Sequence, residues 1–215
     1  MTKIEMPFVR RLGVDIDNTV ADTSKHIAAY VQERHGIHVS LDIVQRVGVT
    51  KAFYMLSKEQ LNEALAASWR DPSVIELIDP RIPDLLRTTC EGEMVRFIPV
   101  GVTASRGENS NIREWVRDND VPFEEILQKK RQMEKAQANV DLQLEDSPKV
   151  AKAFADLGKP VVMVTDANPE LQQLLTPQGF VHYSTWPDIP KYLQGNLRLL
   201  NQLGVTQELE YVDIR

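Results

Sequence analysis

The sequence predicts an α/β protein with an open parallel sheet and a small helical insertion after the first strand. From about residue 94 onward, short apolar runs alternate with stretches of helical periodicity. One further apolar run, Phe8–Val14, precedes this part and is separated from it by a helix-rich segment. Strands that alternate with helices form parallel sheets through right-handed crossovers. Such sheets bind ligands at the carboxyl ends of their strands.

The expected strands are short runs of apolar and β-branched residues. After Phe8–Val14 they are Met94–Val102, Val140–Leu144, Pro160–Thr165 and Phe180–Tyr183, with a shorter one at Phe123–Leu127. Pro99 lies inside the second run, and a proline in a central strand removes a hydrogen bond of the ladder. An alternative is therefore a strand that starts only after Pro99.

Two helices are expected between the later strands, at Asn109–Asn119 and Pro148–Leu157. The second has clear ends, because Ser147-Pro148 is a typical helix start and Gly158 a typical stop. The last segment, residues 196–215, starts Leu-rich and ends acidic, and the sequence assigns no role to it.

The helix-rich insertion covers residues 20–87. Its expected helices are Thr23–His35, closed by Gly36, then Leu41–Val47 and Ser57–Trp69, the last with a capping box of Ser57 and Gln60. An insertion after the first strand would lie over the carboxyl edge of the sheet as a cap; the alternative is a helical layer packed on the core. The expected division is a core of residues 1–19 and 88–195 and a cap of residues 20–87.

The composition is that of a soluble globular protein. The chain has 215 residues, of which 42% are apolar and 26% charged. Its single cysteine, Cys90, excludes an intrachain disulfide and favours a reducing compartment. No apolar run approaches the roughly 20 residues that span a bilayer, and the N-terminus lacks the apolar core of a signal peptide. We therefore expect a cytoplasmic protein that does not bind a membrane.

The net charge of −6 argues against a broad electrostatic contact with duplex nucleic acid. It does not exclude a small phosphorylated ligand, because a local site can differ in sign from the whole molecule. The four histidines show no spacing with Cys90 that would form a zinc site.

Two carboxylates follow the first strand, Asp15 and Asp17. If the strand is buried, both come together at its tip, and Ile16 points away. Such a stretch taken alone is more often a turn and a helix cap. Two carboxylates this close repel each other, so their presence suggests a cation between them, and Mg²⁺ prefers oxygen ligands.

Three further polar signals follow in order. A strand ends at Thr103-Ala104-Ser105-Arg106, where hydroxyl and backbone N–H groups suit a phosphate and Arg106 adds a charge. Lys135 precedes the next strand, which ends in Glu145-Asp146 before a helix. Each signal has an ordinary structural explanation, because Thr and Ser cap helices, a single lysine is usually solvated, and Asp146 could cap the helix that follows.

The ordered set of these signals resembles the haloacid dehalogenase superfamily of phosphohydrolases, which implies a Rossmann-like parallel sheet. More closely, the chain resembles the 5′(3′)-deoxyribonucleotidase (cytosolic type C nucleotidase) family and its bacterial relatives. The residues that carry this closer likeness are Thr103-Ala104-Ser105-Arg106 with Arg113-Glu114-Trp115, then Val121-Pro122-Phe123, and Leu144-Glu145-Asp146-Ser147-Pro148 with Gly158-Lys159-Pro160-Val161.

The resemblance implies a role for each matching residue. Asp15 matches the nucleophile that forms an aspartyl-phosphate, and Asp17 the general acid–base, whose backbone carbonyl also faces Mg²⁺. Thr103 and Ala104 match the phosphate-binding turn, and Arg106 a substrate contact. Lys135 matches the cation beside the phosphate, with Lys129 and Lys130 as alternatives. Asp15, Asp17 and Asp146 match the metal site, with Glu145 as a further ligand, direct or through water.

The implied activity is Mg²⁺-dependent hydrolysis of a phosphomonoester, with a nucleoside monophosphate as the first candidate substrate. A phosphatase or phosphomutase for a sugar phosphate or another small phosphometabolite is the alternative, and a non-catalytic binding module is an alternative of another class. Glu145 stands where the family often has an aspartate. Phe53, Tyr54 and Trp69 could stack on a base, although aromatic residues on helices are more often in the core. The sequence leaves the oligomeric state open.

Overall fold

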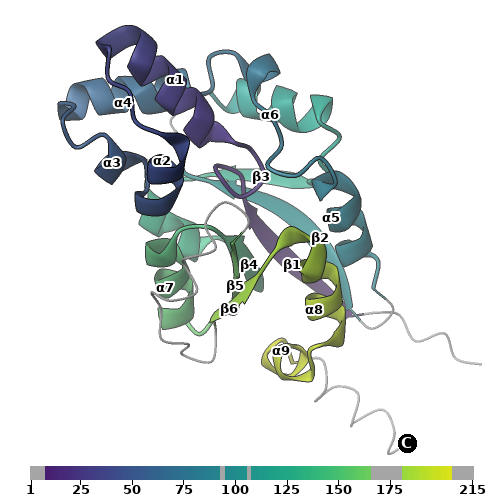
Figure 1. Cartoon of the computed structure of the whole chain (residues 1–215). Coiled ribbons are helices and arrows are strands. Elements are labelled where there is room, and N and C mark those ends of the chain that lie inside the picture. Colours follow the sequence, from purple (N-terminus) through teal and green to yellow (C-terminus); the bar gives the residue numbers. More distant parts are fainter. Residues whose placement is uncertain (1–7, 93–94, 106–107, 166–180, 205–215) are drawn as a thin grey trace, which may run out of the picture.

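The fold is built on one six-stranded parallel sheet with helices on both faces (Figure 1). The computed structural model describes residues 8–92, 95–105, 108–165 and 181–204. The strand order is β3-β2-β1-β4-β5-β6, and every pairing is parallel. The strands are β1 (Phe8–Asp15), β2 (Val95–Thr103), β3 (Glu125–Gln128), β4 (Leu142–Glu145), β5 (Val161–Val164) and β6 (Val181–Ser184).

This sheet confirms the predicted α/β fold class and all six expected strands, with ends that differ by one or two residues. The expected ends Met94 and Phe180 lie outside the described residues. The chain adds β2 and β3 on one side of β1 and then returns to place β4 on the other side. The direction of the chain across the sheet therefore reverses between β1 and β4. In open α/β sheets the ligand crevice forms at this reversal, beyond the carboxyl ends of the strands.

Pro99 lies within β2, so the alternative of a strand that starts after this proline is wrong. The Pro99 carbonyl accepts a hydrogen bond from the Glu124 amide, on the side of β3. In a strand, the N–H and C=O of one residue point to the same side, so the missing N–H of Pro99 also faces β3. The β2–β3 pairing begins only at Val100 and Glu125. The proline therefore sits beyond the end of that ladder, where its missing donor costs no pairing.

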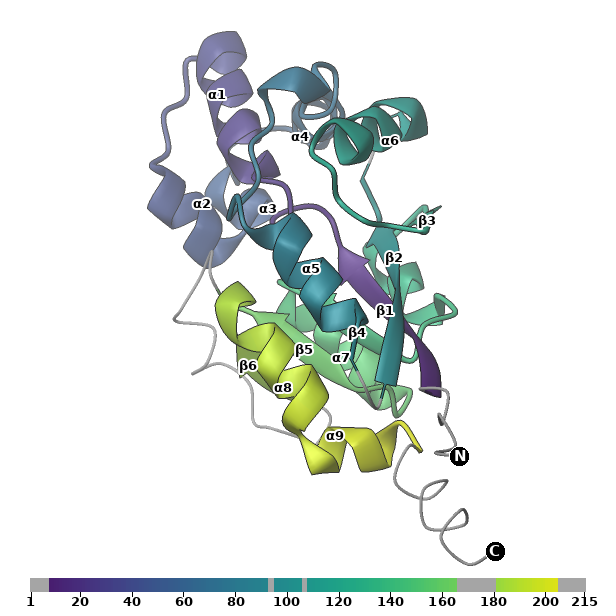
Figure 2. The ribbon, with the colours of Figure 1, turned by 90° about the vertical axis from the view of Figure 1, so that its right-hand side faces the viewer.

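Two apolar clusters lie on opposite faces of the sheet, as the alternation of side chains along a strand requires. Val162 and Val164 of β5 belong to one cluster, and Val161 and Met163 to the other. The first is covered by α5 (Ile82–Cys90), α6 (Asn109–Asp118), α8 (Ile189–Gly195) and α9 (Leu197–Gln202). The second is covered by α7 (Pro148–Asp156) and the short 3₁₀ helix η2 (Gln132–Gln137). Figure 2 shows α5 and α8 side by side in front of the sheet.

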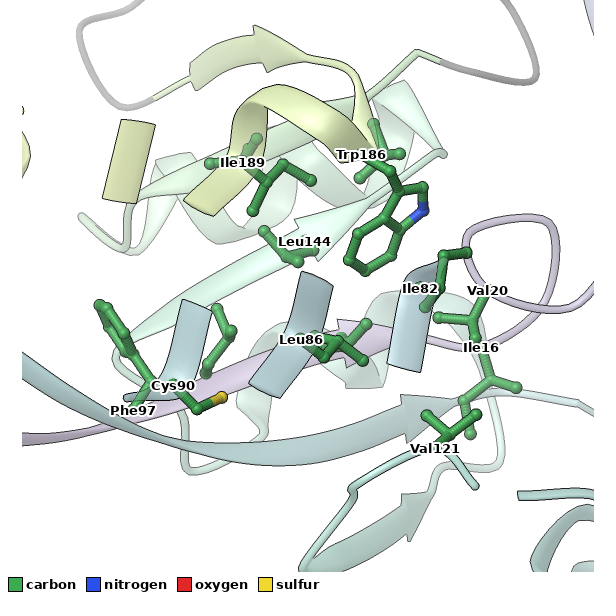
Figure 3. Close-up of a cluster of buried hydrophobic side chains, with 14 of the residues drawn as sticks. Ile16, Val20, Ile82, Leu86, Cys90, Phe97, Val121, Leu144, Trp186 and Ile189 are labelled. Atoms are coloured by element: carbon green, nitrogen blue, oxygen red, sulfur yellow. The ribbon is translucent and has the colours of Figure 1, made fainter. Parts of the chain in front are cut away.

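Helix α5 belongs to the sheet layer although it spans the boundary expected at residue 87. It packs against β2 and α8, and its side chains Ile82, Leu86 and Cys90 are buried in the first cluster. Figure 3 shows these three side chains in that cluster together with Leu144, Trp186 and Ile189. The insertion that leaves the sheet layer therefore ends before α5.

The rest of the insertion forms a separate helical group beyond the carboxyl ends of the strands (Figures 1 and 2). It has its own apolar cluster, which includes Ile27, Val31, Phe53 and Ala64. The capping box of Ser57 and Gln60 is present as predicted. Its helices are α1 (Thr23–His35), α2 (Leu41–Val47), α3 (Val49–Ala52) and α4 (Lys58–Ala67), followed by a 3₁₀ turn, η1 (Pro72–Val74). We call α1–α4 the cap helices. Among the described residues, no helix combines the length and apolarity that crossing a bilayer demands.

Candidate active site

Four of the residues singled out in the sequence lie at the ends of three neighbouring strands. Asp15 is the last residue of β1, Thr103 the last of β2 and Glu145 the last of β4. Asp146 follows directly after β4. Since β2, β1 and β4 are adjacent and parallel, their carboxyl ends meet at one edge. The sheet topology therefore brings these side chains together at the point where the strand order reverses.

Lys135 reaches the same point from η2. Its Nζ lies 2.6 Å from Asp15 Oδ1 and 3.2 Å from Glu145 Oε2. The lysine side chain is only 1% exposed, and both carboxylates are equally buried. A lysine is rarely buried unless it is paired, so its place here depends on the acids of two strands. Lys129 and Lys130, the alternatives left open by the sequence, follow β3; Lys130 is exposed.

The electrostatics of this cluster are dominated by burial of like charges. Burial, and then repulsion by Glu145, raise the pKa of Asp15 well above its ordinary value. Burial raises the pKa of Glu145 to about 7, although Lys135 opposes the shift. Burial and then Asp15 raise the pKa of Asp146 to about 8. Burial lowers the pKa of Lys135, but Asp15 and Glu145 outweigh it and hold the pKa above its ordinary value. When all three acids are ionised, they therefore carry more negative charge than one lysine can balance.

These carboxylates fit a hard divalent cation. One oxygen from each of Asp15, Glu145 and Asp146 lies within 4.8 Å of the others. Carboxylate oxygens are the ligands that Mg²⁺ prefers, and a dication would offset the charge that Lys135 leaves uncompensated. The Asp17 carboxylate is not in this group; its oxygens bond elsewhere.

Backbone and hydroxyl donors fix Asp15 further. Its Oδ1 accepts the Ile16 N–H at 2.9 Å, and its Oδ2 accepts the Thr19 hydroxyl at 3.4 Å. The loop that carries Thr19 turns at Asn18, which has φ of +60°, and the Asn18 side chain accepts the N–H of Ser24 in α1 at 2.9 Å. The first cap helix is thus tied to the loop beside Asp15.

Asp17 is held by two donors from different parts of the chain. The Thr103 hydroxyl donates to Asp17 Oδ2 at 2.7 Å, and the Trp69 indole N–H donates to Oδ1 at 2.9 Å. Thr103 is itself fixed, because its oxygen accepts the N–H of Ser105 at 2.8 Å. Asp17 and Thr103 therefore meet beside the strand tips, a contact that the sequence did not predict. Ala104 is half-buried beside Thr103, and Arg106 lies outside the described residues.

The three aromatic candidates for base stacking differ in exposure. Trp69 is 0% exposed and Phe53 is buried within the cap helices, whereas Tyr54 is 81% exposed. In this conformation the first two rings offer no free face to a base. Trp69 instead belongs to the apolar cluster on the sheet.

The sequence did not predict two further hydrogen bonds at this site. Trp69 bonds to Asp17, and the buried indole of Trp186 donates to the Thr19 carbonyl at 2.7 Å. Trp186 belongs to the 3₁₀ turn η4 (Trp186–Asp188), 167 residues from Thr19. No local sequence signal links residues so far apart. For Trp69 a weak signal existed, since a buried indole N–H needs an acceptor.

Solved structures share this fold. A haloacid dehalogenase-like family hydrolase from Streptococcus pneumoniae is 14% identical, with a TM-score of 0.64, and the match covers 86% of this chain and 99% of that one. A protein described as a predicted phosphoglycolate phosphatase, from Haemophilus somnus, is 16% identical, with a TM-score of 0.59 and coverage of 88% and 100%. An L-2-haloacid dehalogenase is 12% identical, with a TM-score of 0.52 and coverage of 86% and 99%.

The fold is therefore that of haloacid dehalogenase-like hydrolases. No protein family model matches the sequence, and a search of curated proteins finds no relative. Because proteins described as a phosphatase and as a dehalogenase both share the fold, the fold does not decide the reaction. That choice depends on the residues at the site.

Proposed function

We propose that the protein is a phosphomonoesterase that uses Mg²⁺ and an aspartyl-phosphate intermediate on Asp15. The observation that carries the proposal is the buried contact of Lys135 with Asp15 and Glu145 beside a third carboxylate, Asp146. A phosphoryl group brings concentrated negative charge, and its transfer needs positioning and charge neutralisation above all. A lysine and a cation site around one carboxylate supply both.

In the first step a carboxylate oxygen of Asp15 attacks phosphorus, and the bond from phosphorus to the leaving oxygen breaks. Asp17 gives its proton to that leaving oxygen, so the product departs as a neutral alcohol. The Asp17 carboxyl group therefore favours an ester substrate over a halide, which needs no proton on leaving. The Thr103 hydroxyl and the Lys135 ammonium hold oxygens of the phosphoryl group in this scheme.

In the second step water attacks the phosphorus of the aspartyl-phosphate. Asp17, now a carboxylate, takes a proton from that water, and the bond between phosphorus and Asp15 breaks. Inorganic phosphate leaves, Asp15 returns as a carboxylate, and Asp17 is again protonated for the next turnover. One residue thus serves as acid and then as base.

The metal ligands in this proposal are Asp15 and Asp146, with Glu145 as a further candidate and Asp17 through its backbone carbonyl. Glu145 also bonds to Lys135 and accepts the Ser147 N–H at 3.2 Å, so part of its capacity is already used. A bound Mg²⁺ supplies charge neutralisation for the carboxylates and the phosphoryl oxygens.

Two substrate classes remain in this proposal. A nucleoside monophosphate is the candidate that the sequence motifs favour. A sugar phosphate or another small phosphometabolite is the second candidate, favoured by the shared fold with the protein described as a phosphoglycolate phosphatase and by the burial of Trp69 and Phe53. Substrate choice would lie in the cap helices, which stand beyond the strand tips.

The test is phosphate release from a panel of deoxynucleotides, ribonucleotides, sugar phosphates and phosphoglycolate, with Mg²⁺ or with a chelator. Asp15→Asn removes the nucleophile while nearly preserving shape, so turnover should fall on the order of 10³-fold or more. Asp156→Asn is the matched control, because that carboxylate pairs with Lys152 on exposed α7 surface and its loss should leave turnover unchanged.

Wild-type turnover in Asp15→Asn would exclude Asp15 as the nucleophile. A folded wild-type protein that binds Mg²⁺ but releases no phosphate from the panel would favour a phosphomutase or a non-catalytic binding module. The best substrate of the panel decides between the two classes.

A further inference from the structure

We propose that Trp69 is a positioning residue that holds the acid–base Asp17 and directs its proton to one oxygen, Oδ2. This inference rests on the proposed function and adds a residue that carries no chemistry of its own. It follows from the two hydrogen bonds that Asp17 accepts, from how Trp69 is itself held, and from the different abilities of the two donors.

The two oxygens of Asp17 have different partners. The Trp69 indole N–H donates to Oδ1 at 2.9 Å, and the Thr103 hydroxyl donates to Oδ2 at 2.7 Å. Trp69 follows the last cap helix, α4, whereas Thr103 ends the core strand β2. The carboxylate plane of Asp17 is thus fixed from two sides, and its rotation would break at least one of these bonds.

Trp69 is rigidly placed. It is fully buried, and its ring packs edge-to-face on Trp115 of α6 with centroids 5.8 Å apart and an interplanar angle of 86°. Its backbone carbonyl accepts the side-chain amide of Asn111, also in α6, at 2.7 Å. Side chain and backbone are therefore both anchored on α6. An anchored donor can orient a carboxylate, whereas a mobile one would follow it.

The two donors differ in what else they can do. An indole N–H only donates, so the lone pair of Oδ1 that faces it stays an acceptor in every protonation state. A hydroxyl can rotate and can also accept. When the Thr103 hydroxyl turns to donate to a phosphoryl oxygen, Oδ2 loses its donor. Oδ2 is then the oxygen free to carry the proton for the leaving group, while Trp69 keeps Oδ1 in place.

The effect of Trp69 on the rate should therefore depend on the leaving group of the substrate. An alkoxide leaving group needs a correctly aimed proton, whereas p-nitrophenolate leaves readily without one. The parameter kcat/KM reports the steps up to release of the leaving group and does not contain the later attack of water. If the Asp17 carboxyl group is no longer correctly oriented, kcat/KM should therefore fall for alkyl phosphates and stay nearly unchanged for p-nitrophenyl phosphate.

The test compares Trp69→Phe with Trp115→Phe on two substrates, p-nitrophenyl phosphate and the best alkyl phosphate of the panel above. Both substitutions remove a buried indole N–H. Trp115 donates to the Ile75 carbonyl at 2.8 Å and has no bond to Asp17, so it matches Trp69 in burial and packing. Trp69→Phe should lower kcat/KM for the alkyl phosphate by roughly tenfold or more relative to p-nitrophenyl phosphate. Trp115→Phe keeps an aromatic ring against Trp69 and leaves the bonds of Trp69 to Asn111 and Asp17 in place, so it should change the ratio of the two substrates by less than about twofold.

Equal losses on both substrates in Trp69→Phe, or the same ratio as in Trp115→Phe, would overturn the inference. If Trp69→Phe does not fold, replacement of Trp69 by the isostere 3-benzothienylalanine keeps the ring shape and removes only the N–H, and the same ratio decides. Asp17→Asn separates this inference from the proposed function. A selective loss in Asp17→Asn without one in Trp69→Phe rejects only the role of Trp69. A wild-type protein that hydrolyses neither substrate rejects both.

Discussion

At the scale of single residues, the site buries more acidic side chains than basic ones. Asp15, Glu145 and Asp146 converge, and one ammonium group, Lys135, contacts two of them. Buried ion pairs gain little over apolar packing, but removing one partner leaves the other charge without compensation. The contact is therefore explained better by ligand binding than by stability, and its loss should still be costly.

Lys135→Met tests this cost. The substitution leaves Asp15 and Glu145 buried without their cation, so the free energy of unfolding should fall by about 3 kcal/mol at neutral pH. Lys152→Met is the control, because Lys152 pairs with Asp156 on the surface and its loss should cost less than about 0.5 kcal/mol. Urea unfolding of both variants measures the difference. Equal small losses would show that the buried contact is not needed for stability.

Residues at strand tips could be predicted from the sequence, and residues that arrive from elsewhere could not. The meeting of Asp15, Thr103 and Glu145 follows from adjacent parallel strands, since their carboxyl ends share one edge. Lys135 comes from a 3₁₀ helix, and its position could be suggested only by family resemblance. The bond of Trp69 to Asp17 depends on how α4 returns to the sheet, which no spacing in the sequence encodes.

At the scale of elements, strands and capped helices were predictable, and the layer to which a helix belongs was not. The helix Thr23–His35 forms with the predicted bounds, because Gly36 closes it in the left-handed conformation at φ of +67°. By contrast, the cap expected from the sequence, residues 20–87, included most of α5, which belongs to the sheet layer. Its buried face, Ile82, Leu86 and Cys90, has ordinary helical spacing, so the pattern indicates a helix but not its partner.

The turn η4 follows β6 and contacts the loop beside Asp15 through the hydrogen bond of the Trp186 indole to the Thr19 carbonyl. Trp186→Phe removes the indole N–H and leaves the Thr19 carbonyl buried without this donor. The free energy of unfolding should fall by about 1–3 kcal/mol. Because Thr19 also donates to Asp15, turnover should fall as well. Denaturant unfolding and phosphate release measure the two effects.

Trp115→Phe is the control for Trp186→Phe, since it removes a buried indole N–H that faces the Ile75 carbonyl. It should cost similar stability and leave the Thr19 contact to Asp15 intact, so turnover of p-nitrophenyl phosphate should stay at the wild-type level. If both variants keep wild-type turnover, the bond to Thr19 serves stability alone.

At the scale of the whole molecule, the acid cluster links stability to pH and, through the proposed cation site, to Mg²⁺. Burial raises the pKa of Glu145 to about 7 and, with Asp15, that of Asp146 to about 8. Ordinary carboxyl groups in an unfolded chain titrate near about 4. Between about pH 4 and about pH 8 the native state therefore binds more protons than the unfolded state, and the free energy of unfolding falls as the pH rises.

Thermal unfolding in chelator should accordingly show a melting temperature that decreases from about pH 5 to about pH 8 and then levels off with respect to these groups. In our proposal Mg²⁺ binds the ionised carboxylates of the native state, so it should oppose the decrease; at a free concentration of 100 times its dissociation constant it would add roughly 2.7 kcal/mol. Asp146→Asn should flatten the profile in chelator and weaken the effect of Mg²⁺. A profile that is the same with and without Mg²⁺ would contradict the cation site.

The connectivity of the sheet also bears on how the protein is made. Strand β1 emerges first, yet its two neighbours are β2 and β4, and β4 ends at Glu145. During synthesis the apolar strand that ends in Asp15 therefore pairs late, whereas the buried residues of the cap cluster are close in sequence, from Ile27 to Ala64. Until β4 has been synthesised, β1 lacks one of its two neighbours and the site at its tip is incomplete, so the apolar strand is exposed to premature association.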